Sequence, residues 1–71
     1  MHPATAALLR HFTYEHLPEH LRRVSRPFCE LAHELANDAS LDGPELTVGL
    51  RKLLEAKDCA VRAALPTPDE E

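Results

Sequence analysis

A chain of 71 residues is long enough for one domain but can bury only a small hydrophobic core, and chains of this size usually gain stability from a disulfide, a metal or a partner chain. The formal charge of −4 argues against general DNA or RNA binding, which requires a basic surface. No segment has the roughly 18 consecutive apolar residues of a membrane-spanning helix, and we expect no signal peptide.

The first half of the chain predicts two helices joined by an irregular link. Because proline is tolerated at a first helical position, Pro3 predicts a short helix through residues 4–11. The segment HFTYEHLP, residues 11–18, reads as the link. A longer helix is predicted over residues 18–37, because apolar side chains recur there at alternating intervals of four and three. These side chains are Leu17, Leu21, Val24, Phe28, Leu31 and Leu35.

Pro27 interrupts this second helix. A proline inside a helix removes one backbone hydrogen bond and crowds the carbonyl four residues earlier. We therefore expect either a kink near residues 23–26 or a break into two helices. Curvature around a partner and a site built at the freed carbonyl are both compatible with such a kink.

The second half predicts a loop and one more helix. The segment NDASLDG, residues 37–43, is rich in turn-forming residues, and Pro44 with Glu45 is typical of a first helical turn. The helix is predicted over residues 44–65, and residues 66–71 are expected to be a disordered acidic tail. The pattern therefore predicts an all-α fold: an antiparallel helical hairpin domain over residues 1–65, with a short N-terminal helix. Because one hairpin leaves much of its apolar stripe exposed, we expect hairpins to assemble into an oligomeric bundle.

Metal and catalytic chemistry find little support. His33-Glu34-Leu35-Ala36-Asn37 begins like the zinc-protease pattern HExxH, but Asn37 stands where the second histidine is needed. Glu30 and His33 form one half of a di-iron motif, without the further glutamates that a full site requires. Cys29 and Cys59 cannot form a disulfide framework and are expected to be reduced, structural thiols. We expect no enzymatic activity, no cofactor and no metal.

The basic residues are more informative. Arg22, Arg23 and Arg26 cluster before the proline, either as a solvated face or as a phosphate site. Arg62 is spaced to form an ion pair with Asp58 one turn earlier. Lys57 occupies the apolar seam of the last helix, where an unpaired ammonium is costly. Its amine must reach solvent, pair with an acid from another chain, or face a polar pocket.

Three segments resemble a family of small phage proteins that includes the anti-CBASS and anti-Thoeris sponges. They are F-x-Y-x-H-x-P at residues 12–18, E-L-A at residues 30–32, and G-P-E-x-T-x-x-L-x-K-L-L-E-A-K-D-x-A-V-R-A at residues 43–63. Together they lie within residues 8–65. The resemblance implies a helical hairpin that forms homo-oligomers, often hexamers. In the cytoplasm of the infected bacterium, such proteins sequester cyclic di- and trinucleotide immune signals without cleaving them.

The resemblance also implies roles for individual residues. Tyr14, or its neighbour Phe12, would stack on a base, and a cation of the second helix, Arg26 or else Arg22, would meet a phosphate. Lys57 and Arg62 would contact phosphates or line a second site between subunits. The alternative is an oligomeric structural or protein-interaction module with no nucleotide ligand, in which Lys57 pairs with a neighbouring glutamate. A DNA-binding helix-turn-helix does not fit the acidic balance and the seven-residue loop.

Overall fold

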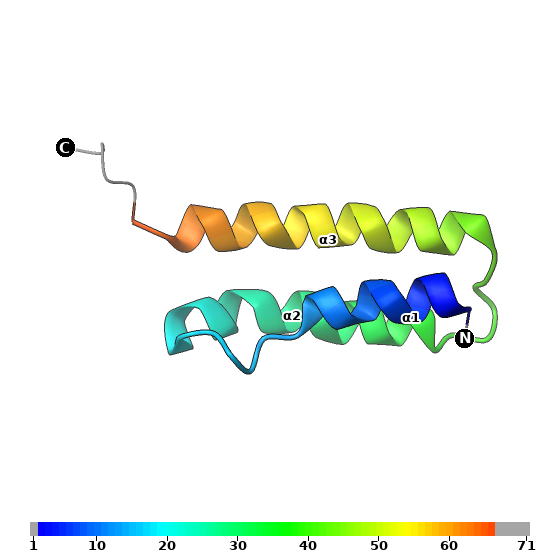
Figure 1. Ribbon diagram of the computed structural model, residues 1–71, viewed down its shortest axis with the longest axis horizontal. Helices are drawn as coiled ribbons and strands as arrows, with labels where there is room; N and C mark the ends of the chain where they lie inside the picture. Colours follow the sequence, from blue (N-terminus) through cyan, green and yellow to red (C-terminus); the bar gives the residue numbers. More distant parts are fainter. Residues whose placement is uncertain (1, 67–71) are drawn as a thin grey trace.

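Three α-helices make up most of the computed structural model, which describes residues 2–66 (Figure 1). Helix α1 spans Pro3–Leu9 and continues into a single 3₁₀ turn, η1, at Arg10–Phe12. Helix α2 spans Glu19–Ala36 and helix α3 spans Pro44–Ala64. The all-α prediction is confirmed, and the predicted helix bounds are right to within one or two residues. The acidic tail lies outside the described residues, apart from Pro66.

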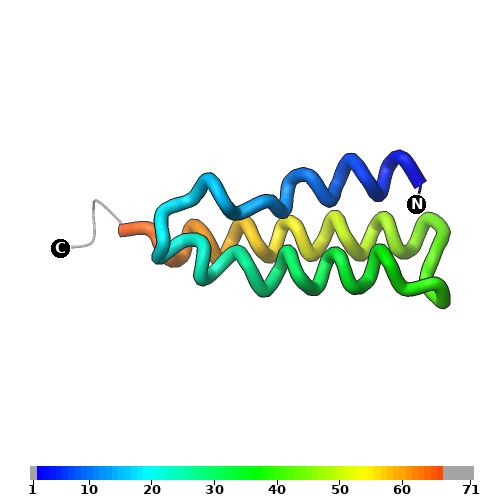
Figure 2. The backbone as a smooth tube through the Cα atoms, turned by 90° about the horizontal axis from the view of Figure 1, so that it is seen from below, coloured from blue at the N-terminus to red at the C-terminus, as the bar shows by residue number. Residues whose placement is uncertain are grey.

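Helices α2 and α3 lie side by side and run in opposite directions (Figures 1 and 2). Segment 37–43 joins them at one end. Helix α1 packs against both of them on one face of the pair, and the link of residues 13–18 leads from η1 back to the start of α2. The opposite face of the α2–α3 pair carries no helix from the described part of the chain.

Helix α2 continues through Pro27 as one α-helix, so the predicted break into two helices is wrong. Proline has no N–H to donate to the carbonyl of Arg23. Both residues are exposed, and water can reach that carbonyl. The missing hydrogen bond therefore costs less than it would inside the core, and the helix tolerates it.

Local side-chain and glycine signals set the turns. The Ala4 N–H donates to Nδ1 of His2 at 3.0 Å, which caps α1. In the loop, the carboxylate of Asp38 accepts hydrogen bonds from the Ser40 N–H at 2.9 Å and the Ser40 hydroxyl at 2.7 Å. These bonds lower the pKa of Asp38. Gly43, with φ at +87°, adopts a conformation that other residues rarely reach and turns the chain into α3.

The core is small and centres on the aromatic ring of Phe12, which is fully buried. The 3₁₀ turn carries this ring to both α2 and α3. Four other residues are almost or fully buried in the same cluster: Leu8, Leu9, Ala32 and Leu50. The core therefore lies on the face of the α2–α3 pair that α1 and η1 cover.

Replacing Phe12 with alanine is expected to lower the free energy of unfolding by about 3–5 kcal/mol, because the lost ring leaves a cavity. A domain of this size has only a few kcal/mol in total, so circular dichroism should show a largely unfolded variant. Leu41→Ala, at a side chain 39% exposed, is the control and should change stability by less than about 1 kcal/mol. A Phe12→Ala variant with the urea midpoint of the wild type would contradict this description of the core.

Candidate functional site

The link of residues 13–18 carries one aromatic ring, Tyr14, and helix α2, which follows it, carries the cation Arg26. Tyr14 is half-buried, and its carbonyl accepts a hydrogen bond from the Leu17 N–H at 3.1 Å. On α2, Nε of Arg26 donates to Oε2 of Glu30 at 2.9 Å. Glu30 raises the pKa of Arg26 through this hydrogen bond and through its charge. No hydrogen bond joins the side chains of Tyr14 and Arg26 in the described part of the chain.

Phe12 does not belong to this site, and its assignment as a ligand-binding residue is wrong. Its ring has no exposed surface, so a nucleotide base cannot stack on it while the core is intact. Tyr14, two residues later, is the aromatic side chain that solvent can reach. The sequence could not separate the two rings, because the 3₁₀ turn that ends at Phe12 determines which of them enters the core.

Arg22 extends the same basic surface by one helical turn. Its Nη2 lies 2.8 Å from Oε1 of Glu19. The Arg22–Glu19 and Arg26–Glu30 pairs are both exposed, with side-chain exposures between 41% and 78%. Exposed ion pairs contribute about 0–1 kcal/mol. Neither guanidinium is therefore held strongly by its carboxylate partner, and both remain accessible to solvent.

Lys57 is largely buried in the seam of α3, as the apolar pattern predicted: only 14% of its side chain is exposed. Its Nζ lies 3.0 Å from Oδ1 of the next residue, Asp58, whose side chain is 46% exposed. Consecutive helical residues point in different directions, so the lysine side chain bends out of the seam to reach this carboxylate. The expected partner for the amine was an acid from another chain, whereas the structure shows pairing with an acid of the same chain, Asp58.

Helix α2 also carries a buried hydroxyl. Ser25 is fully buried, and its Oγ has no hydrogen-bond partner in the described part of the chain. Each of the two long helices therefore carries a polar side chain that is largely or fully buried, Ser25 on α2 and Lys57 on α3.

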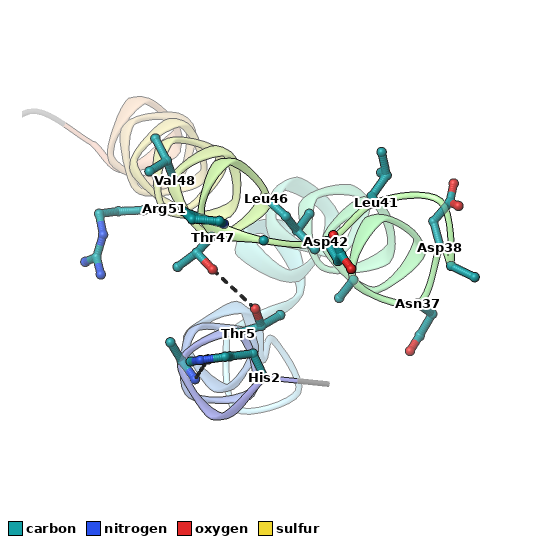
Figure 3. Close-up of a pocket in the computed structure, with 15 residues that line it drawn as sticks. His2, Thr5, Asn37, Asp38, Leu41, Asp42, Leu46, Thr47, Val48 and Arg51 are labelled. Atoms are coloured by element: carbon teal, nitrogen blue, oxygen red, sulfur yellow. Dashed lines mark hydrogen bonds between the residues drawn. The ribbon is translucent and has the colours of Figure 1, made fainter.

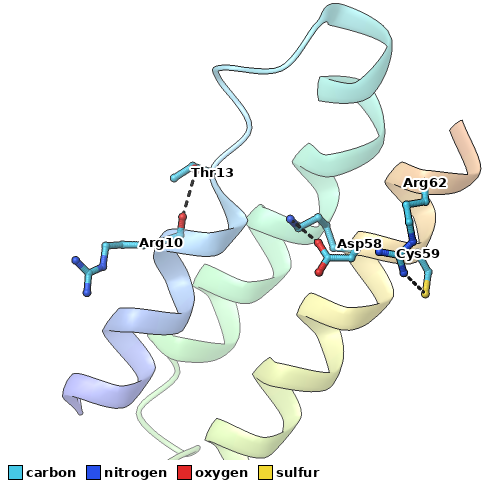
Figure 4. Close-up of polar contacts among 6 residues, drawn as sticks. Arg10, Thr13, Asp58, Cys59 and Arg62 are labelled. Atoms are coloured by element: carbon cyan, nitrogen blue, oxygen red, sulfur yellow. Dashed lines mark hydrogen bonds and ion pairs between the residues drawn. The ribbon is translucent and has the colours of Figure 1, made fainter. Parts of the chain in front are cut away.

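Arg62 is not brought to Tyr14 and Arg26. Its Nη2 donates to Sγ of Cys59 at 3.5 Å, and Figure 4 shows the Arg62 side chain beside Cys59 and away from Thr13 of the link. The predicted ion pair with Asp58 is wrong, because that carboxylate binds the ammonium of Lys57 instead. A buried ammonium needs a partner more than an exposed guanidinium does.

Metal ligands do not cluster in residues 2–66: no group of three or more His, Cys, Asp or Glu side chains could hold an ion there. None of the described helices is long and apolar enough to cross a membrane.

Two grooves that the sequence did not predict lie near the loop of residues 37–43, each of about 660 Å³. The first lies between the start of α1, the loop and the first turns of α3 (Figure 3). Within it the hydroxyls of Thr5 and Thr47 face each other at 3.5 Å. The second, between the loop, α2 and α3, is lined largely by leucines and includes no residue of α1. None of the six predicted site residues lines either groove.

Comparison of the sequence with models of protein families gives no match, and comparisons with curated proteins and with solved structures give none either. The family resemblance therefore rests on the residue pattern alone.

Replacing Lys57 with leucine is expected to raise the free energy of unfolding by about 1 kcal/mol or more, because an apolar side chain in the seam replaces a desolvated ammonium. Asp58 is half-exposed and stays solvated after the change. Urea unfolding of wild type, Lys57→Leu and the control Arg51→Leu, at an exposed position of α3, would measure it. A marked loss of stability in Lys57→Leu alone would show that the ammonium stabilises the fold.

Alkylation of the two thiols tests how the link packs on α2. Burial raises the pKa of Cys29, and the charges of Glu15 in the link and Glu30 on α2 raise it further, whereas Cys59 is exposed. Since the thiolate is the reactive form, iodoacetamide at pH 8 should modify Cys29 several-fold more slowly than Cys59. Mass spectrometry of Cys29→Ser and Cys59→Ser, each with one thiol left, gives the two rates. Equal rates would contradict the placement of the link.

Proposed function

We propose that the protein binds cyclic di- or trinucleotides of bacterial immune signalling and sequesters them without cleavage. In this proposal it works in the cytoplasm of a phage-infected bacterium, as a homo-oligomer of helical hairpins, hexameric by the family resemblance. The observation that supports the proposal best is a solvent-accessible tyrosine in the link, Tyr14, together with two cations of α2 that are held only by exposed ion pairs, Arg22 and Arg26, in an otherwise acidic chain.

The chemistry of this pair suits a cyclic nucleotide. Each base offers a flat π-face, and stacking on an aromatic side chain contributes about 1–3 kcal/mol per base. Each phosphate offers oxygens to a guanidinium, which is planar and binds them in a fork. Tyr14 supplies the first contact and Arg26 the second, with Arg22 one turn away on the same helix. A local basic surface can bind a small anion even though the whole chain is acidic.

Lys57 and Arg62 belong to the proposal in a secondary role. In one chain, Lys57 is held by Asp58 and Arg62 by Cys59, away from Tyr14. We assign them to a second site between subunits, where an anionic ligand would replace these local contacts. Lys57→Leu separates this role from folding, because we expect the variant to be at least as stable as the wild type.

The binding test is isothermal titration of cyclic di- and trinucleotides into the wild type, Tyr14→Ala and Arg26→Ala. Each substitution is expected to weaken binding about fivefold or more, since each removes a contact of about 1 kcal/mol or more. Arg51→Ala, at an exposed arginine of α3 that lines the loop groove, is the control and should bind as the wild type does.

Recovery of the ligand distinguishes sequestration from catalysis. Heat denaturation of the complex should release the cyclic nucleotide intact, as chromatography would show. Linear products would contradict binding without cleavage. The absence of heat with every ligand, from a folded oligomer, would contradict the nucleotide proposal.

One observation favours the alternative, a structural or protein-interaction module. The second groove exposes apolar surface that nothing in the described chain covers, and Lys57 already has a carboxylate partner without any ligand. In that case the surface of Tyr14 and Arg26 would have no ligand, and Tyr14→Ala and Arg26→Ala would leave the protein's associations unchanged.

A further inference from the structure

The leucine-lined groove lies between the loop, α2 and α3, and no residue of α1 lines it. Leu50 lies beneath it, and the partly buried Leu35, Leu46 and Leu53 line its walls. Leu41, 39% exposed, lies at its edge. A chain with so small a core gains substantially from covering this apolar surface, at about 25 cal/mol for each Å² removed from water.

Gly49 is the feature of this groove that its own chain does not explain. It lies in the interior of α3 and is exposed, and a Cβ added there would meet nothing within 4 Å. Glycine inside a helix is about 0.5–1 kcal/mol less favourable than alanine. Packing within the chain therefore gives no reason for it. A second helix that crosses α3 at this position would explain the glycine, because the missing side chain allows the two backbones to approach closely.

The charged residues on either side of Gly49 indicate which helix crosses α3 there. Glu45 lies about one turn before the glycine and Lys52 about one turn after it, and both line the groove. Neither has an ion-pair partner between residues 2 and 66. In an antiparallel crossing of α3 with a second α3, Glu45 of each copy meets Lys52 of the other. A parallel crossing would instead place Glu45 against Glu45.

We propose that a second copy of this chain docks on the groove through a two-fold axis, with the two α3 helices crossing antiparallel near Gly49 and exchanging Glu45–Lys52 ion pairs. Such an interface is self-complementary, as two-fold symmetry requires. Asp42, also on the groove, adds negative charge at the end where Lys52 of the second copy arrives. The inference deepens the self-association in the proposed function and is independent of the nucleotide.

Sedimentation velocity over a dilution series tests the crossing point. Gly49→Leu is expected to weaken self-association at least tenfold, because the new side chain separates the helices, while circular dichroism shows equal or greater helix content. Cys59→Leu, at an exposed position of α3 outside the groove, is the matched control and should associate as the wild type does. A monomeric wild type at high micromolar concentration, or unchanged association of Gly49→Leu, would overturn the proposal.

Charge reversal tests the antiparallel pairing by a second route. Glu45→Lys and Lys52→Glu should each weaken association, since each brings like charges together, and the double variant should restore it. Two weakened single variants that do not rescue each other would contradict the predicted pairs.

Titration of cyclic nucleotides into the same samples separates this proposal from the nucleotide proposal. Association through Gly49 without nucleotide binding would leave the interface standing and contradict the ligand. Nucleotide binding by a wild type that stays monomeric would support the ligand and contradict the interface.

Discussion

The burial of Phe12 is the constraint on which the candidate site depends. Its ring has no exposed surface and contacts the core that α1, α2 and α3 share. Because the ring is fixed at the end of the 3₁₀ turn, the chain that follows must leave the core in one direction, along α2. That direction carries the link, with Tyr14, to the start of α2, the helix that bears Arg26. A core contact therefore sets where the half-buried ring of Tyr14 leaves the core.

The small size of the core also explains the other face of the helix pair. With α1 and η1 covering one side of the α2–α3 pair, the opposite side keeps a groove lined by leucines. Lys57 on α3 and Ser25 on α2 weaken the packing further, because each is a polar side chain that is largely or fully buried. A small domain with these features is expected to gain stability from other copies of itself, and in our proposal one of them docks at Gly49.

Much of the fold could be predicted from the sequence because it depends on local signals. The regular spacing of leucines predicted α2 and α3, and Gly43 with Pro44 predicted the start of α3. The burial of Lys57 followed from its place in the apolar pattern. The positions of Phe12 and Asp58 could not be predicted in the same way. The 3₁₀ turn determines that the ring of Phe12 enters the core. The buried ammonium of Lys57 pairs with the Asp58 carboxylate, which the helical spacing alone would pair with Arg62.

The candidate site was predicted in part. Arg22 and Arg26 share helix α2, whereas Arg62 lies on α3 beside Cys59. The stacking role of Tyr14 stays a prediction. The two grooves had no signal in the sequence, because each depends on where the loop of residues 37–43 lies against helices from distant parts of the chain.

The most direct test of the central claim, that Tyr14 stacks on a nucleotide base, uses its own fluorescence. Tyr14 is the only tyrosine and the chain has no tryptophan, so tyrosine emission reports this ring alone. Titration with a cyclic dinucleotide is predicted to quench the emission in a saturable way, whereas the matched linear dinucleotide, which absorbs equally, should give only the optical attenuation. Identical curves for the cyclic and linear ligands would contradict the account.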